Sequence, residues 1–244
     1  MSIGTKIKIM RESYRLSQND LADKLDISPK IILETTADGS HTLFLPGMKE
    51  HYHSVNGAIR ESNHVYIEAG FRQCRKSEIH VLEMGFGTGL NTLLTALEAK
   101  RQKIKVVYTG LEKLPLSQGI INRLNYTNYQ ENNLFEIIHQ TEWGKLESVN
   151  QYFYLEKIQI DFRDFNFPNK YDVVYYDAFA PDKQPEVWSQ ALFDKIFSSM
   201  NPDGILTTYC AKGNIRRMMQ QAGFSVERIP GPPGKREMLR GKVL

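Results

Sequence analysis

The sequence is poor in the residue types that form disulfides and metal centres. Its 244 residues include only two cysteines, Cys74 and Cys210, which stand far apart, and six histidines with no H-x-x-x-H pair. Neither residue type shows the spacing of a metal-binding motif. We therefore expect two buried thiols in a reducing, cytoplasmic compartment and no bound metal.

Long apolar runs and a strong excess of charge are also missing. No stretch approaches the roughly 20 apolar residues of a membrane span, and the N-terminus lacks the apolar core of a signal peptide, so no membrane association is expected. A net charge of +3 is too small to indicate a nucleic-acid partner by itself. The length and the 41% hydrophobic content suit one sizeable α/β domain with a small appendage.

The most informative stretch runs from Glu78 to Asn91. An apolar run over 79–82 is typical of a buried parallel strand, and Gly85, Gly87 and Gly89 follow it at every second position. Apolar residues then recur at helical spacing over 90–99. A strand, a glycine turn and a helix open an α/β unit that binds a nucleotide, because glycine lets the backbone approach the ligand.

The residues around these glycines favour one kind of ligand. A dinucleotide fingerprint requires glycine or alanine at position 90, where this chain has Leu90. An acid, Glu83, stands two residues before the first glycine. This pattern resembles motif I of class I S-adenosylmethionine-dependent methyltransferases, in which the acid faces the amino-acid end of the cofactor. The predicted cofactor-binding residues of this segment are Glu83, Gly85, Gly87, Gly89 and Asn91; the alternative is an ordinary glycine turn.

Two further acids follow predicted strands. Glu112 ends a strand predicted over 104–111, where both ribose hydroxyls of a nucleoside can donate to one carboxylate. The alternative is a solvated charge at the start of a helix, which we expect over 115–124. Asp164 follows a stretch rich in aromatic and β-branched residues over 152–162, and we prefer it to Asp161 as an acceptor for the adenine amino group.

Asp177 is the leading catalytic candidate. It follows the apolar segment YDVVYY at 171–176 and precedes Ala-Phe-Ala-Pro. An acid at the carboxyl end of a central strand lies where open α/β sheets bind ligands. The alternative is an aspartate that caps its own loop. Upstream, the polar and aromatic segment 51–54 either covers the sheet or walls the pocket, and Tyr52 is predicted to contact the cofactor.

The N-terminal segment carries a second pattern. SQNDLADKLDIS, at 17–28, is similar to the start of a repressor-type helix-turn-helix. In that family a third helix enters the major groove, but here Pro29 and a β-branched run replace it. We therefore interpret residues 1–33 as a helical appendage resembling a truncated helix-turn-helix, and sequence-specific DNA binding is not expected.

Three blocks together resemble one family, the methyltransferase domain of the bacterial bifunctional protein that makes 5-methylaminomethyl-2-thiouridine in tRNA. The blocks are LEMGFGTGLN, YYDAFAPDKQPEVWSQALFDKI and AGFSVERIPGPPGKREMLRG. The resemblance assigns residues 34–244 to a Rossmann-like domain with a mostly parallel central sheet and helices on both faces. It implies methyl transfer from S-adenosylmethionine to the aminomethyl group of a wobble uridine. The family's two-enzyme form continues into a flavin-dependent oxidase domain, so we expect a stand-alone methyltransferase without FAD.

The substrate side is predicted from the same blocks and from charge. Phe179 and Pro181 of the DAFAP segment, with Lys235 and Arg236 after the Pro-Gly turn, are the predicted substrate residues. From residue 212 onward eight basic residues face two acidic ones. For Arg216 and Arg217, an equal alternative is that they lie on a solvated face of a helix. The expected partner is a tRNA anticodon loop, whose unpaired bases can be splayed out, with a separate enzyme supplying the aminomethyl-uridine.

Two rival functions remain at this point. A class I methyltransferase acting on a small-molecule amine would use the same Glu83, Glu112 and Asp177. The second is a DNA-binding regulator with a degenerate enzyme domain, which the N-terminal segment would suggest. Against it, the acids predicted to bind the cofactor are present, and the third helix, which would enter the major groove, is missing. The sequence leaves open the oligomeric state and whether the target uridine carries sulfur.

Overall fold

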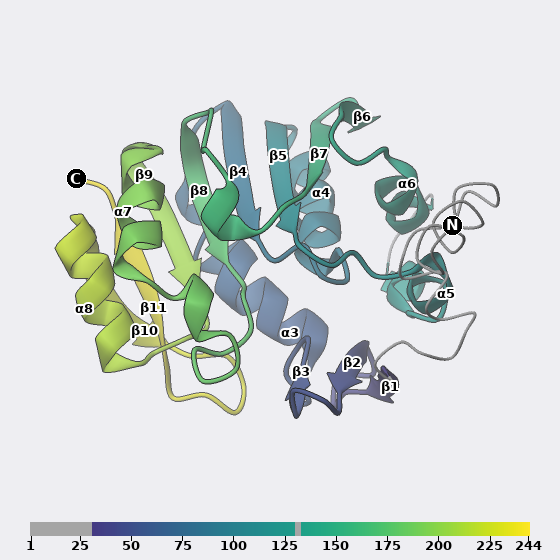
Figure 1. Cartoon of the computed structure of the whole chain (residues 1–244). Coiled ribbons are helices and arrows are strands. Elements are labelled where there is room, and N and C mark those ends of the chain that lie inside the picture. Colours follow the sequence, from purple (N-terminus) through teal and green to yellow (C-terminus); the bar gives the residue numbers. More distant parts are fainter. Residues whose placement is uncertain (1–30, 130–132) are drawn as a thin grey trace, which may run out of the picture.

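The computed structural model describes residues 31–129 and 133–244, and its main feature is an eight-stranded, mostly parallel sheet flanked by helices (Figure 1). This confirms the expected Rossmann-like class. The appendage predicted over residues 1–33 lies outside the described residues except for its last three positions.

The strands of the main sheet follow the order β10-β11-β9-β8-β4-β5-β7-β6. The five central strands run parallel, while β6, β10 and β11 pair antiparallel at the two edges. Their bounds are β4 Glu78–Met84, β5 Lys105–Glu112, β6 Leu146–Asn150, β7 Phe153–Gln159, β8 Tyr171–Tyr176, β9 Met200–Thr208, β10 Ser225–Pro230 and β11 Glu237–Lys242.

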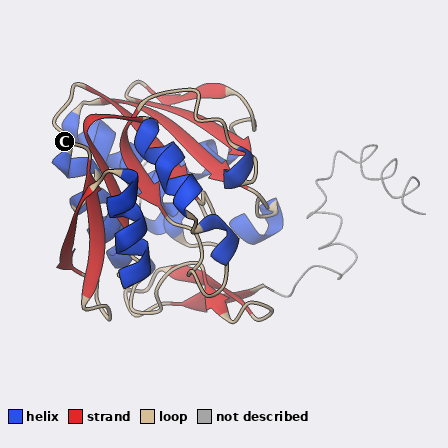
Figure 2. Cartoon of the chain, turned by 60° about the vertical axis from the view of Figure 1, so that its left-hand side comes forward, coloured by secondary structure: helices blue, strands red, loops and turns tan. Residues whose placement is uncertain are grey.

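Helices connect these strands and cover both faces of the sheet (Figure 2). The first described helix, α3, continues directly into a π-helix. The bounds are α3 Ala58–Ser62, the π-helix Asn63–Glu68, α4 Leu90–Gln102, α5 Gln118–Ile121, α6 Leu134–Gln140, α7 Gln190–Ser198 and α8 Gly213–Ala222. Short 3₁₀ turns lie at Phe71–Gln73, Tyr126–Tyr129, Phe162–Asp164 and Pro185–Val187. The helix predicted over 115–124 is confined to the four residues of α5.

Strand β8 shows how the sheet separates two apolar cores. Side chains alternate across a strand, so a strand covered on both sides is apolar at nearly every position; in β8 the exception is Asp172, whose carboxylate accepts from the Lys76 ammonium. Val173 and Tyr175 pack into the core beneath α4 and α6, and Val174 and Tyr176 pack into the core beneath α7 and α8. All six residues of β8 are buried as a result.

A small antiparallel sheet precedes α3 and lies beside it in Figure 1. It consists of β1 Ile32–Thr35, β2 His41–Leu45 and β3 Glu50–His51. The hairpin of β1 and β2 turns at Asp38-Gly39, and the Asp38 carboxylate accepts hydrogen bonds from the Ser40 backbone N–H and the Thr36 hydroxyl. The sheet leads the chain into the segment that covers the carboxyl ends of the central strands.

Strand β4 marks the point where the strand order reverses. The chain passes from β4 to β5 on one side and later places β8 on the other. The loops after β4 and β8 therefore diverge and leave a crevice at the carboxyl ends, where such sheets bind ligands. There the Asp177 backbone N–H donates to the Met84 carbonyl at 3.0 Å, which fixes the two strand ends against each other.

Candidate active site

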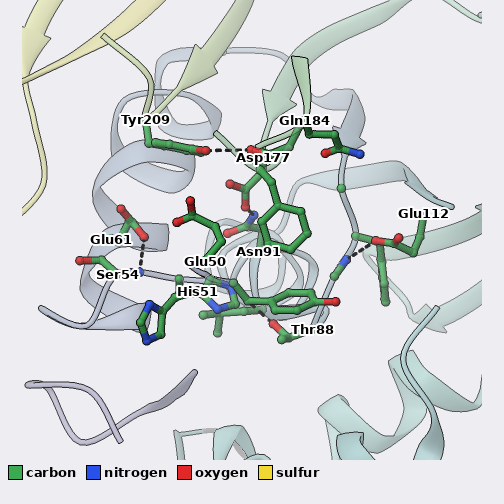
Figure 3. Close-up of a pocket in the computed structure, with 18 of the residues that line it drawn as sticks. Glu50, His51, Ser54, Glu61, Thr88, Asn91, Glu112, Asp177, Gln184 and Tyr209 are labelled. Atoms are coloured by element: carbon green, nitrogen blue, oxygen red, sulfur yellow. Dashed lines mark hydrogen bonds between the residues drawn. The ribbon is translucent and has the colours of Figure 1, made fainter. Parts of the chain in front are cut away.

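A cavity of about 330 Å³ opens at the carboxyl ends of β4, β5 and β8, beneath the segment 50–55. Its size falls in the range of small-molecule sites. Figure 3 shows Asp177 and Asn91 between Glu61 and Glu112. The structure brings eight of the predicted site residues to this cavity: Tyr52, Gly85, Gly87, Asn91, Glu112, Asp177, Phe179 and Lys235.

The glycine turn after β4 needs glycine for two separate reasons. Gly85 and Gly87 have φ values of 104° and 51°, a region that other residues rarely adopt. A Cβ at Gly85 would lie 2.5 Å from the Asp177 carbonyl oxygen, and one at Gly87 would lie 3.2 Å from the Tyr52 ring. The turn thus passes close to both walls of the cavity, and a side chain here would displace them.

Glu112, at the end of β5, is held by the glycine turn. Its carboxylate accepts from the Gly87 backbone N–H at 3.0 Å and from the Leu114 backbone N–H at 2.9 Å. Burial raises the pKa of this carboxyl, and the backbone donors oppose that shift. Each carboxylate oxygen can accept more than one hydrogen bond, so Glu112 keeps acceptor capacity toward the cavity.

Asn91, near the start of α4, joins two carboxyl groups. Its side-chain N–H₂ donates to Glu83 Oε1 at 2.9 Å and to Asp177 Oδ2 at 2.8 Å, while the Thr92 hydroxyl donates to the other Glu83 oxygen. Burial raises the pKa of Glu83, and the nearby charge of Asp177 raises it further. Burial likewise raises the pKa of Asp177 to about 7. Within the described chain the buried Asn91 Oδ1 has no hydrogen-bond partner.

Sequence reasoning missed the far wall of the cavity. Glu61 of α3 is buried, accepts from the Lys235 ammonium and from the Ser54 backbone N–H, both at 2.7 Å, and faces Asp177. The Lys235 nitrogen also lies 4.0 Å from the centroid of the Tyr209 ring. No sequence motif marked Glu61 as a site residue.

Five predicted site residues do not line the cavity. Glu83 is fully buried behind it, and Gly89 lies at the start of α4 against His139. Pro181 and Arg236 lie outside the lining, and the Arg236 side chain is 94% exposed. The structure also does not bring Asp164 to the cavity.

The turn that carries Asp164 explains its position. Asp164 is exposed, and Phe162 of the same 3₁₀ turn lines the cavity instead. The alternative candidate Asp161 forms ion pairs with Lys113 and Arg163. The extended stretch ends earlier than expected, at Gln159, so the following acids fall on a turn whose apolar residue points inward.

Searches for metal and membrane features gave no candidates within the described ranges 31–129 and 133–244. No group of three or more histidine, cysteine, aspartate or glutamate residues there could hold a metal ion. No helix in these ranges is long and apolar enough to cross a membrane.

Comparison with known proteins agrees with this geometry. Residues 128–243 match the family model described as S-adenosyl-L-methionine-dependent methyltransferase. The crystal structure of MNMC2 from Aquifex aeolicus has the same fold, with a TM-score of 0.70 at 20% identity over 98% of this chain and 82% of that one. Spermidine synthase from Thermotoga maritima superposes with a TM-score of 0.50 at 10% identity over 88% and 72%. The chain therefore has the fold of the class I S-adenosylmethionine-dependent methyltransferases, and its C-terminal half matches their family model.

Within that class it is similar to the tRNA 5-methylaminomethyl-2-thiouridine biosynthesis bifunctional protein MnmC. It is 31% identical to the protein of Actinobacillus pleuropneumoniae serotype 5b over 219 residues, which are 78% of this chain and 32% of that protein. It is 29% identical to the protein of Leptospira borgpetersenii serovar Hardjo-bovis over 207 residues, with the same coverage. The chain thus spans about a third of the length of these relatives.

Proposed function

We propose that the protein transfers a methyl group from S-adenosylmethionine to the primary amine of a 5-aminomethyl-uridine at the tRNA wobble position. The observation that carries the proposal is the position of Asp177. Its carboxylate lies at the strand-order reversal, lines the cavity and is held by two hydrogen-bond donors. The names of the sequence relatives supply the tRNA substrate.

The residues of the cavity fit the cofactor. Gly85 and Gly87 keep the turn free of side chains, and Glu112 offers acceptor capacity to ribose hydroxyls. Asn91 Oδ1 is a buried acceptor without a partner in the described chain, and an ammonium group such as that of the cofactor's amino-acid end would satisfy it. When bound, S-adenosylmethionine supplies a methyl group that its positive sulfur already activates.

The chemistry of an amine acceptor explains why a buried carboxylate is needed. A primary aliphatic amine has a pKa near 10, so at pH 7 only about one molecule in a thousand carries the lone pair that attacks the methyl carbon. We assign Asp177 the acceptance of the amine proton and the orientation of the nitrogen. Because burial raises the pKa of Asp177 to about 7, this carboxylate is a stronger base than an exposed aspartate.

The charge of the lining supports a cationic substrate group. Four carboxylic acids line the cavity: Glu50, Glu61, Glu112 and Asp177. Its two lysines are paired with carboxylates, Lys113 with Asp161 and Lys235 with Glu61. An acidic cavity stabilises an approaching aminomethyl ammonium and the cofactor sulfonium, because both are cations. An uncharged atom of a nucleobase would not be stabilised in this way.

The cavity mouth offers contacts for a base and for phosphate. The rings of Tyr52 and Phe179 meet edge to face, with centroids 5.2 Å apart. Aromatic rings of this kind hold splayed bases of single-stranded RNA loops. Lys235 borders the cavity and the exposed Arg236 follows it, so we propose that this turn contacts the phosphates of the anticodon loop. On this proposal the enzyme acts in the cytoplasm, and another enzyme supplies its aminomethyl-uridine.

The test is incubation with labelled S-adenosylmethionine and tRNA from cells that make the 5-aminomethyl-uridine but do not methylate it, followed by nucleoside analysis. We expect label in a 5-methylaminomethyl-uridine. The free 5-aminomethyl-uridine nucleoside serves as the matched small-molecule acceptor. Equal turnover of nucleoside and tRNA would show a small-molecule methyltransferase instead, and no label in either would overturn the proposal.

A further inference from the structure

Tyr66 reaches the active site from a π-helix. In the segment Asn63–Glu68 the Ala69 backbone N–H donates to the His64 carbonyl, five residues earlier, at 3.2 Å. A π-turn contains one more residue than the α-turn it replaces, so it changes the direction of the side chains around it. Such turns often occur at functional sites. Here it places the buried Tyr66 ring against Tyr175 of β8, with ring centroids 5.1 Å apart.

The next glycine fixes this helix end against the sheet. A Cβ at Gly70 would lie 2.6 Å from the Tyr66 carbonyl oxygen, 3.2 Å from Thr207 Oγ1 and 3.3 Å from the Tyr175 ring. A contact of 2.6 Å with a backbone atom cannot form without movement of the backbone. Gly70 therefore allows the helix to press onto β8 and β9, and the position of Tyr66 is set from both sides.

The Tyr66 hydroxyl donates to Asp177 Oδ1 at 2.5 Å, while Asn91 donates to Oδ2 at 2.8 Å. Two donors from two different elements thus hold one oxygen each. A carboxylate held at both oxygens cannot rotate, so its free lone pairs keep one direction. A fixed orientation of the Asp177 carboxylate favours proton transfer, because the carboxylate must accept the amine proton along one direction.

We propose that Tyr66 is a positioning residue for this reaction, which fixes the orientation of Asp177 and keeps it ionised and ready to accept the amine proton. The inference rests on the proposed function, because the proton in question belongs to the aminomethyl group. Tyr66 acts through Asp177, and its own hydroxyl needs no contact with the substrate.

The charges around Asp177 show why a donor is needed. Burial raises the pKa of Asp177, the Tyr66 hydrogen bond opposes this shift, and the negative charge of Glu61 adds to it. Asn91 links Glu83 to Asp177, because its side chain donates to both carboxyl groups, and Tyr209 lies beside Asp177. Among the described residues, Lys235 is the cation that faces Asp177. Without the tyrosine donor, Asp177 would be largely protonated at neutral pH and unable to accept a proton.

The experiment compares Tyr66→Phe with Tyr175→Phe, which removes a neighbouring buried hydroxyl that pairs with Thr95. The Asp177 carboxyl is titrated by carbon-13 NMR in the protein without substrate, and its signal is assigned by its loss in Asp177→Asn. We expect Tyr66→Phe to raise the titration midpoint by about one pH unit, as is typical for loss of one hydrogen bond to a charged group. At pH 7 kcat should fall about fivefold, because the ionised fraction of Asp177 falls from about one half to about one tenth, and it should recover at higher pH, with S-adenosylmethionine affinity kept within about twofold.

An unchanged midpoint in folded Tyr66→Phe, or an equal shift in Tyr175→Phe, would overturn the inference. If Tyr66→Phe does not fold, 3-fluorotyrosine at position 66 is the second variant, since its more acidic hydroxyl should lower the midpoint while keeping the ring; no change would again contradict us. Failure of the proposed function is recognised separately. In that case the midpoint shifts as expected, but the wild-type protein methylates no tRNA.

Discussion

Asp177 shows how one residue acquires its chemistry from its neighbours. An exposed aspartate has a pKa near 4 and is a poor proton acceptor for an amine. Here burial raises the pKa to about 7, and donors from Tyr66 and Asn91 limit the rise. The group therefore changes protonation in the physiological range, as a general base requires.

The first prediction concerns pH. Because Asp177 must be ionised to accept a proton, kcat/KM with tRNA should increase with pH and break at about 7. A second break, near 10, would belong to the amine itself. Steady-state rates from pH 5.5 to 10.5 would separate the two. A profile that breaks only near 10 would show that Asp177 does not limit the reaction.

Gly85 permits a direct test of the glycine turn. Gly85→Ala should weaken S-adenosylmethionine binding at least tenfold, because its Cβ would lie 2.5 Å from the Asp177 carbonyl oxygen at a φ of 104°. Gly144→Ala is the matched control, since Gly144 also has a positive φ, 78°, but nothing within 4 Å of a Cβ. Calorimetric titration of both variants gives the measurement. Cofactor affinity in Gly85→Ala equal to that in Gly144→Ala would contradict the prediction, because Gly144 does not line the cavity.

At the scale of elements, the sequence predicted the central strands well and one connecting helix poorly. The strands ending at Glu112 and Asp177 were predicted correctly because a strand buried on both faces is a continuous apolar run, and the acid that follows marks its end. The helix predicted over 115–124 shrank to four residues, since its apolar pattern is short and tertiary contacts decide such segments.

The same contrast holds within the site. Gly85, Gly87, Glu112 and Asp177 were predictable because each follows a strand at a fixed spacing, and parallel strands end at the same edge of the sheet. Glu61 and Tyr66 were not predicted as site residues, because no motif marks the helix α3, and a π-turn such as the one that carries Tyr66 leaves no residue signature. Asp164 does not line the cavity, and residue order does not show which side of a turn faces it.

Helix α4 carries an ion-pair network far from the chemistry. Burial alone would raise the pKa of Glu98, but hydrogen bonds from Arg101 and Arg72 outweigh it and hold the pKa at about 2. A lowered carboxyl pKa stabilises the fold above its unfolded value of about 4.5, and this stabilisation is lost as pH falls toward 2.

Replacing this carboxylate should therefore affect stability and not the site. We expect Glu98→Gln to lower the free energy of unfolding by about 1–3 kcal/mol at pH 7, with a smaller difference at pH 3. Glu142→Gln, at a side chain 71% exposed, should change it by less than about 0.5 kcal/mol. Urea unfolding measures both variants. An equal effect at pH 7 and pH 3 would show that lost packing, not lost charge, is responsible.

At the scale of the whole molecule, the structure separates two basic residues that the sequence had grouped. Lys235 borders the cavity and is paired with Glu61, whereas the Arg236 side chain is 94% exposed. An exposed guanidinium beside the cavity can reach phosphate without breaking a buried ion pair. We therefore expect Arg236, more than Lys235, to contribute to the salt dependence of tRNA binding.

Charge reversal tests this difference. Arg236→Glu should weaken tRNA binding and reduce the slope of log affinity against log salt by about one to two. Lys103→Glu is the control, because this exposed lysine follows α4 at the opposite end of the sheet. Filter binding over a range of salt concentrations measures both. The same slope in Arg236→Glu as in the wild type would place the phosphate contacts elsewhere.

The most direct test of the account is the Asp177→Asn variant, which keeps the size of the side chain and removes its basicity. Calorimetry should find S-adenosylmethionine binding within about threefold of wild type, while methyl transfer to tRNA that carries 5-aminomethyl-uridine falls by at least about 10²-fold, the contribution of a general base. Turnover close to that of the wild type would contradict the account, because the reaction would then proceed without the carboxylate around which the cavity is built.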